Sequence, residues 1–141
     1  MKEGENQLKT GINMNLDIRN RVSALIDAIN NSNDTHKAND LEAVEDFIKD
    51  CGRYVDARTA HQAASQVARF RMDTEAYQAY IVNLDRNRRA AHDTVMVNIR
   101  LMNRLCRIYH LDKMYAGPDE RHAMADFALE VATAYFNNQQ R

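Results

Sequence analysis

The sequence predicts an all-α fold, a single-domain bundle of four to five helices built around one long central helix over about residues 74–111. Three observations predict it. The chain of 141 residues contains four glycines and one proline, too few turn residues for short strands joined by tight hairpins. Apolar residues recur at helical spacing from Asn15 onward. Between Asp73 and Leu111 there is no glycine or proline, and the largest residues follow in alternating steps of four and three.

Residues 1–13 are polar and lack a helical period, so we expect a disordered tail, followed by a helical bundle domain over residues 14–141. A first helix is expected from Asn15. Its apolar face consists of Ile18, Val22, Leu25, Ile26 and Ile29.

A second helix is expected from about Asn39, and Gly52 either bends it or ends it. A third helical segment is expected from about Asp56 to Phe70, although Arg58 and Gln62 occupy core-type positions near its start. The last helix is expected to have Pro118 in its first turn and to end near Asn137.

The long helix from Thr74 to Leu111 is about 55 Å long, so the other helices are expected to pack along it. Its core-facing seam consists of Tyr77, Ile81, Leu84, Arg88, Ala91, Val95, Asn98, Met102, Leu105 and Tyr109. Arg88 and Asn98 are therefore polar residues at core-type positions.

Composition narrows the class of protein. The formal net charge of −1 argues against a general nucleic-acid binder or a binder of anionic membranes. No apolar run approaches the ~18 residues of a membrane span, and the N-terminus lacks a signal-peptide core, so we expect a cytoplasmic protein without membrane contact. Cys51 and Cys106 lie in apolar helical patterns and are expected to be reduced core thiols.

The long helix carries two further stripes on the side opposite its seam. One is an arginine sector, which consists of Arg86, Arg89, Arg100, Arg104 and Arg107. The other is a second apolar strip, which the few remaining helices are not expected to cover and which consists of Ala90, Thr94, Val97, Leu101 and Ile108. We therefore expect this side to meet a second copy of the chain in a homodimer. The predicted interaction surface consists of Arg86, Arg89, Val97, Arg100, Leu101, Arg104 and Ile108.

The first functional hypothesis is a non-enzymatic protein–protein interaction or regulatory module. The second is a ligand- or metal-binding bundle, a possible hydrolase, centred on Arg88 and His92, with Asp85 and Asn98 as further ligand-binding residues. Because an unpaired buried charge costs several kcal/mol, the alternative to a ligand is a polar network. Its acids would come from the second helix, at Glu42, Glu45 or Asp46.

The third hypothesis is nucleic-acid binding by the arginine stripe. No aromatic residues interleave with these arginines for base stacking, so nucleic acid is a disfavoured partner.

Known catalytic patterns occur only as fragments. His61, then His92-Asp93, then Asp126 follow the order used by HD-type metal phosphohydrolases, but His and Asp adjacent in a helix point ~100° apart. Glu42 and Glu45 resemble the first half of the paired-acid motif of MazG-type pyrophosphohydrolases, and the second half is missing. We therefore assign no catalytic residue, no metal and no cofactor.

Several runs along the chain together resemble one family. They are Phe70-Arg71, Asp85 with Arg88-Arg89, Ala91-His92-Asp93, Asn98 with Asn103-Arg104-Leu105-Cys106, and Ala125-Asp126-Phe127. The chain resembles, from about Asp17 to Phe136, short bacterial proteins mainly of Firmicutes catalogued as domain of unknown function 3232. The resemblance implies a small all-helical bundle and a bacterial source, and it implies no activity and no functional residues.

Overall fold

The computed structural model describes residues 3–68, 70 and 74–136, with side chains from residue 15 onward. This part of the chain forms four helices and no strand: α1 (Glu3–Asn30), α2 (Lys37–Ala68), α3 (Glu75–Ile108) and α4 (Arg121–Phe136). The all-α bundle and its long central helix are confirmed. The backbone of α1 is helical from Glu3, within the predicted tail, and the division between tail and bundle at residue 13 stays a prediction.

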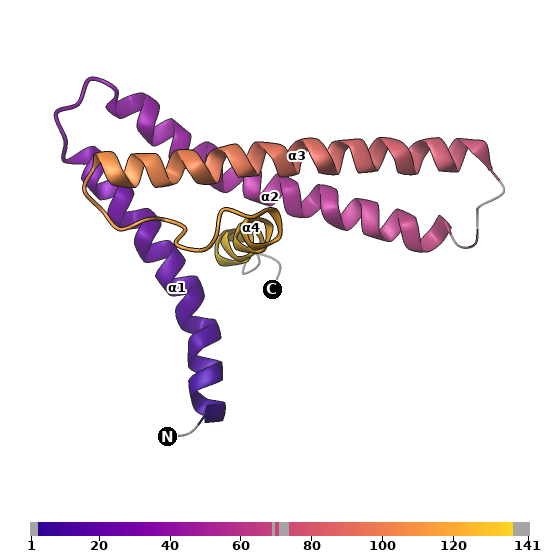
Figure 1. Ribbon diagram of the computed structural model, residues 1–141, viewed down its shortest axis with the longest axis horizontal. Helices are drawn as coiled ribbons and strands as arrows, with labels where there is room; N and C mark the ends of the chain where they lie inside the picture. The colour runs from indigo at the N-terminus through magenta and orange to yellow at the C-terminus, as the bar shows by residue number, and fades with distance from the viewer. Residues whose placement is uncertain (1–2, 69, 71–73, 137–141) are drawn as a thin grey trace.

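The helices α2 and α3 lie side by side in opposite directions and form the long axis of the molecule (Figure 1). Helix α4 crosses this hairpin near its middle, and α1 runs away from the end where α2 begins (Figure 1). The hairpin therefore extends beyond α1 and α4 on the side of the α2–α3 connection.

The core lies where α1 and α4 meet the hairpin. Its fully buried large side chains are Ile18, Val22, Leu25, Ile29, Val44, Phe47, Val95, Ile99, Met102, Met114, Met124 and Val131. The predicted apolar face of the first helix is thus confirmed. Cys51 and Cys106 are free, buried thiols, as expected, and burial raises the pKa of each.

Two arginines of α1 fasten it to the C-terminal part of the chain. Arg19 Nε donates a hydrogen bond to the carbonyl oxygen of Ala134 at 2.9 Å, which links α1 to the last turns of α4. Arg21 donates to the carbonyl oxygen of Met114, and its guanidinium carbon lies 5.9 Å from the ring centroid of Phe127. These contacts hold α1 across α4 and across the segment that precedes α4.

The connection from α3 to α4 is held by the side chain of Asn103. Its amide group donates to the carbonyl oxygen of Tyr115 and accepts from the backbone N–H of the same residue, both at 2.9 Å. The Tyr115 hydroxyl donates to the carbonyl oxygen of Pro118 at 2.6 Å. Because Pro118 belongs to this turn, α4 begins only at Arg121, and the predicted place of Pro118 in the first helical turn is wrong.

Helix α2 continues through Gly52 without a break, so the separate segment predicted from Asp56 is wrong. The glycine has a packing role instead. A Cβ atom at Gly52 would lie 2.9 Å from Cε2 of Phe136, closer than van der Waals contact allows. The missing side chain therefore lets the end of α4 approach α2, which the periodicity of α2 alone does not reveal.

We predict that Gly52→Ala destabilises the protein by about 1 kcal/mol, because the clash with Phe136 outweighs the ~1 kcal/mol that alanine adds to helix propensity. In a Phe136→Ala background the clash is gone, and the same substitution is expected to be stabilising by up to ~1 kcal/mol. Urea unfolding of the four proteins measures both values. An equal effect of Gly52→Ala in the two backgrounds would contradict this role.

Candidate functional site

Asp85 of α3 is the centre of a cluster of cationic side chains. Its Oδ1 accepts hydrogen bonds from Nε and NH2 of Arg88 at 3.1 and 2.6 Å, and Oδ2 lies 2.9 Å from Nε of Arg89. Nε2 of His61, from α2, lies 3.6 Å from Oδ1. The hydrogen bond from Arg88 is the main cause that lowers the pKa of Asp85, and the charges of Arg88, Arg89 and His61 act in the same direction, while desolvation opposes them.

This cluster corrects one expectation. Arg88 pairs with Asp85, three residues earlier on its own helix, and not with the acids expected on the second helix, namely Glu42, Glu45 and Asp46. The reason is geometric, because residues three apart are neighbours on one helix surface. Arg88 is therefore satisfied locally and remains partly exposed.

Next to this cluster, a polar cavity of about 340 Å³ lies where α4 begins against the hairpin. It is lined by Tyr54, Arg58, Arg88, His92, Arg121, His122, Ala125, Asp126 and Leu129. The lining thus comes from three helices and includes three guanidinium groups, two imidazoles and one carboxylate. Arg88 is already paired with Asp85, and NH2 of Arg121 lies 3.9 Å from Oδ1 of Asp93.

His92 and Tyr54 form the buried side of this cavity. They are 7% and 4% exposed, and their rings meet edge to face with centroids 5.7 Å apart. Nδ1 of His92 lies 3.5 Å from NH2 of Arg121 and 3.6 Å from Oδ1 of Asp93. His92 is thus the first buried residue of α3, counted from its N-terminus.

The predicted ligand-binding residues do not all meet. Asp85, Arg88 and His92 follow one another along α3, with Arg88 and His92 lining the cavity. Asn98 lies apart from the cavity lining, where its Nδ2 donates to Oδ2 of Asp50 at 2.8 Å. The assignment of these four residues to ligand binding stays a prediction.

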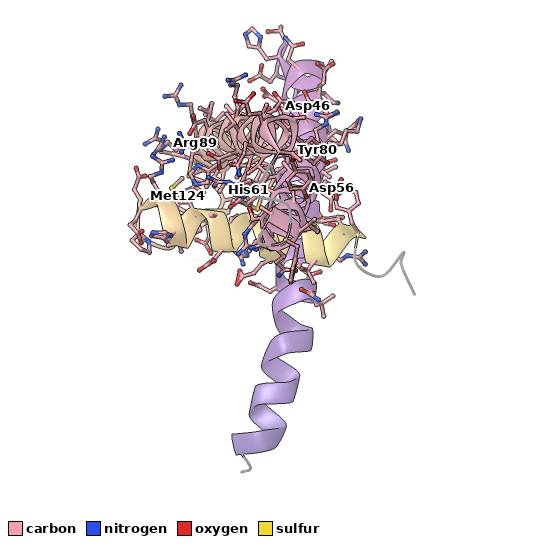
Figure 2. All side chains as sticks on the ribbon, turned by 90° about the vertical axis from the view of Figure 1, so that its right-hand side faces the viewer. Asp46, Asp56, His61, Tyr80, Arg89 and Met124 are labelled. Atoms are coloured by element: carbon pink, nitrogen blue, oxygen red, sulfur yellow. The ribbon has the colours of Figure 1, made fainter. Side chains whose placement is uncertain are left out.

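The predicted interaction surface lies on the exposed side of α3. Val97 is 62% and Ile108 is 51% exposed, while Leu101 is partly buried. The strip therefore remains largely uncovered by the other described helices. Looking along the hairpin, Figure 2 shows Arg89 on the flank opposite to Tyr80.

The five arginines of this side have different surroundings. Arg89 pairs with Asp85, and Arg100 pairs with Asp119 at 2.9 Å. Arg86, Arg104 and Arg107 form no ion pair with any described residue. Three of the five line a groove of about 520 Å³ with other basic groups, namely Arg100, Arg104 and Arg107 with His110 and Lys113. Nucleic-acid binding by this stripe stays a prediction.

Several cavity residues were not among the predicted site residues. Tyr54, Arg121 and His122 gave no sequence signal, because only the crossing of α4 over the hairpin brings them together. Arg58 did give one, since it is a charged residue at a core-type position of α2, in the same way as Arg88 on α3. Paired irregularities of this kind on two helices can indicate a shared polar site.

The residues of the HD-type order do not form a metal centre here. His61 faces Asp85, whereas His92 and Asp126 line the cavity. Among the residues whose side chains the structure describes, no group of three or more His, Cys, Asp or Glu side chains is arranged to hold a metal ion.

The arrangement defines a small all-α domain with a polar cavity at a three-helix junction. The chain belongs to the family described as "Protein of unknown function (DUF3232)", whose model matches residues 12–141, nearly the whole chain. This confirms the resemblance seen in the sequence. No curated protein and no solved structure matches the chain. Within the described residues, no helix is long and apolar enough to cross a membrane.

The pKa of Asp85 predicts how the stability of the protein depends on pH. Because this pKa is lower in the folded chain than the ordinary value of 3.8, Asp85 contributes stability above that value and loses it as the pH falls through the folded pKa. We expect Asp85→Asn to be less stable than the wild type near neutral pH, with a difference that shrinks in acid.

Urea unfolding of both proteins at about pH 7 and about pH 3 measures this difference. Asp56→Asn is the matched control, since Asp56 is exposed and forms no ion pair with a described residue, and it is expected to have little effect at either pH. A constant difference between Asp85→Asn and the wild type would show that the charge of Asp85 is not involved.

Proposed function

We propose that the protein is a non-enzymatic interaction module that self-associates through the free half of its α2–α3 hairpin. We call this half the arm and define it as residues 57–68 of α2 and 75–91 of α3. The supporting observation is that few side chains of the arm are buried. Among its described residues only Ala64 and Ala68 are buried, whereas the seam residues Tyr77, Ile81 and Leu84 are partly exposed.

The arm and its connection also expose large apolar side chains. Val67, Phe70, Tyr80 and Val82 are 43%, 87%, 51% and 57% exposed. Ile81 and Val82 line a groove of about 500 Å³ together with Arg86 and Arg89, two residues of the predicted interaction surface. These side chains lie on both flanks of the arm, because Val82 lines this groove with Arg89, which lies opposite to Tyr80 (Figure 2). Exposed apolar surface is typical of sites of protein contact.

A second copy of the chain is the partner that fits this surface. Two antiparallel helices bury one side of each helix, and a stable bundle needs further helices of similar length on the open side. The arm of a second copy supplies two such helices with the same apolar pattern, and a two-fold axis makes the contact self-complementary. The product is a four-helix bundle formed by two arms.

The charge of the arm predicts how salt affects this association. Between Ala57 and Ala90 the sequence has six arginines and three acidic residues. Two arms therefore repel each other at low ionic strength, and salt screens this repulsion. We expect self-association to strengthen as the salt concentration rises.

Size-exclusion chromatography with light scattering tests the proposal, and a dimer is expected. Because Phe70 and Tyr80 are exposed and contribute little to the fold of one copy, Phe70→Glu and Tyr80→Glu are expected to yield folded monomers. Leu16→Glu is the matched control, since Leu16 is 54% exposed on α1, outside the arm, and should leave the dimer intact.

Val97→Glu distinguishes between two candidate interfaces, the arm and the second apolar strip of α3. If Val97→Glu alone produces monomers, the strip forms the interface and the arm does not. A monomeric wild type at high protein and salt concentration would overturn self-association by either surface.

A further inference from the structure

We propose that the cavity between α2, α3 and the start of α4 binds a small molecule that carries a phosphate group. The proposal rests on three guanidinium groups that different helices bring to one cavity, Arg58 from α2, Arg88 from α3 and Arg121 from α4. It also rests on the free hydroxyl of Tyr54 in the same wall. Arg58 and Arg88 belong to the arm, but the proposal does not require the arm to associate, and the binding experiment tests it separately.

Arg58 is the first argument for an anionic ligand. It is partly buried, yet it forms no ion pair and no hydrogen bond with any described residue. A guanidinium that leaves bulk water without a partner loses solvation free energy and gains nothing in return. An anion in the cavity would supply that partner.

Arg88 is held in place for such a role. Asp85 accepts from its Nε and one terminal nitrogen through a single carboxylate oxygen. Because a guanidinium has five N–H donors, others remain available on the side of the cavity. Asp85 thus orients Arg88 without using up its capacity to bind.

Tyr54 is the second argument. The residue is 4% exposed and lines the cavity, and its hydroxyl forms no hydrogen bond with a described residue, although the hydroxyl oxygen itself still reaches solvent. The hydroxyl is therefore free to donate to a group that enters the cavity. A phosphate oxygen accepts from a hydroxyl and from guanidinium N–H groups alike, so one ligand group satisfies Tyr54 and Arg58 together.

The start of α4 adds positive charge beside the cavity, although Glu120 Oε1 already accepts from the backbone N–H of His122 at 3.0 Å. Arg121 and His122 are the first residues of the helix, where the peptide dipoles place about half a positive charge. Of the three guanidiniums, Arg88 is paired with Asp85 and Arg121 NH2 lies 3.9 Å from Oδ1 of Asp93, so Arg58 is the one without a carboxylate partner. Guanidinium groups match the geometry of phosphate oxygens, which makes phosphate a better ligand than a single carboxylate.

The size of the cavity indicates more than inorganic phosphate. At about 340 Å³ it lies within the ~300–1,000 Å³ typical of small-molecule sites. Ala125 and Leu129 supply apolar surface beside the charged groups. A phosphomonoester with a short organic part is therefore the class of ligand that fits.

The groove lined by Arg100, Arg104 and Arg107 does not offer the same site. It lies at the C-terminal end of α3, where the helix dipole disfavours anions. Its arginines are exposed. Arg104 therefore provides a matched control for any nonspecific attraction of anions by the protein.

Isothermal titration calorimetry with inorganic phosphate and with glycerol 3-phosphate tests the site, and glycerol is the uncharged control. We expect the wild type to bind both anions with dissociation constants of millimolar order or tighter, and glycerol 3-phosphate more tightly. Arg58→Gln should weaken binding about tenfold or more, because it removes a charge-assisted hydrogen bond. Tyr54→Phe should weaken it several-fold, and Arg104→Gln less than about twofold.

Arg58→Gln keeps this test clear of folding effects, because Arg58 makes no described polar contact that the substitution would break. Thermal unfolding of each variant verifies that the fold is intact. The proposal is overturned if the wild type binds neither anion at about 10 mM, or if Arg104→Gln weakens binding as much as Arg58→Gln does.

Discussion

The structure depends on a mismatch in length between the α2–α3 hairpin and the helices that cover it. Helices α2 and α3 have 32 and 34 residues, whereas α4 has 16 and crosses the hairpin near its middle (Figure 1). Helix α1 packs near the end of the hairpin where α2 begins and α3 ends (Figure 1). Apolar side chains of the hairpin are therefore fully buried only in the half between that end and α4. The same two helices therefore form a closed core from His92 to Cys106 on α3 and an open arm before it.

The boundary between these halves explains why charged residues are tolerated at some core-type positions of the hairpin. Arg58 and Arg88 occupy core-type positions, but they lie at the rim of the covered half, where a guanidinium can reach both solvent and a cavity. His92 follows Arg88 by one helical turn, lies within the covered half and is buried. A charged residue at the level of Val95 or Ile99, which are fully buried, would have no such outlet.

The extent of the helices could be predicted from the sequence because helical periodicity is a local property. The seam from Tyr77 to Tyr109 needs only the spacing of its own residues, and so does the apolar face of α1. Which other segments pack on a helix depends on residues far away in the sequence, so periodicity does not reveal it. Gly52 contacts a residue far along the chain, Phe136, so its packing role left no trace in the pattern of α2, where a glycine indicated a bend or an end.

The candidate site shows the same division between local and distant information. The pairing of Arg88 with Asp85 follows from their spacing of three residues, although a partner on the second helix was predicted. Arg121 and Tyr54 meet only because of the angle at which α4 crosses the hairpin, which no periodicity encodes. Asn98 broke the seam in the same way as Arg88, yet it contacts Asp50 and lies apart from the cavity lining.

The cavity and the arm are physically connected through two residues. Arg58 and Arg88 belong to the base of the arm, whereas Arg121 belongs to α4, which meets the hairpin only in its covered half. An anion held by all three would link the start of α4 to the base of the arm and would favour the arrangement in which these elements are docked. Since a ligand that binds one arrangement shifts the equilibrium toward it by mass action, the occupied cavity would fix the direction in which the arm is presented to a second copy. If both proposals hold, the uncovered hairpin combines an interaction surface with an anion site at its base.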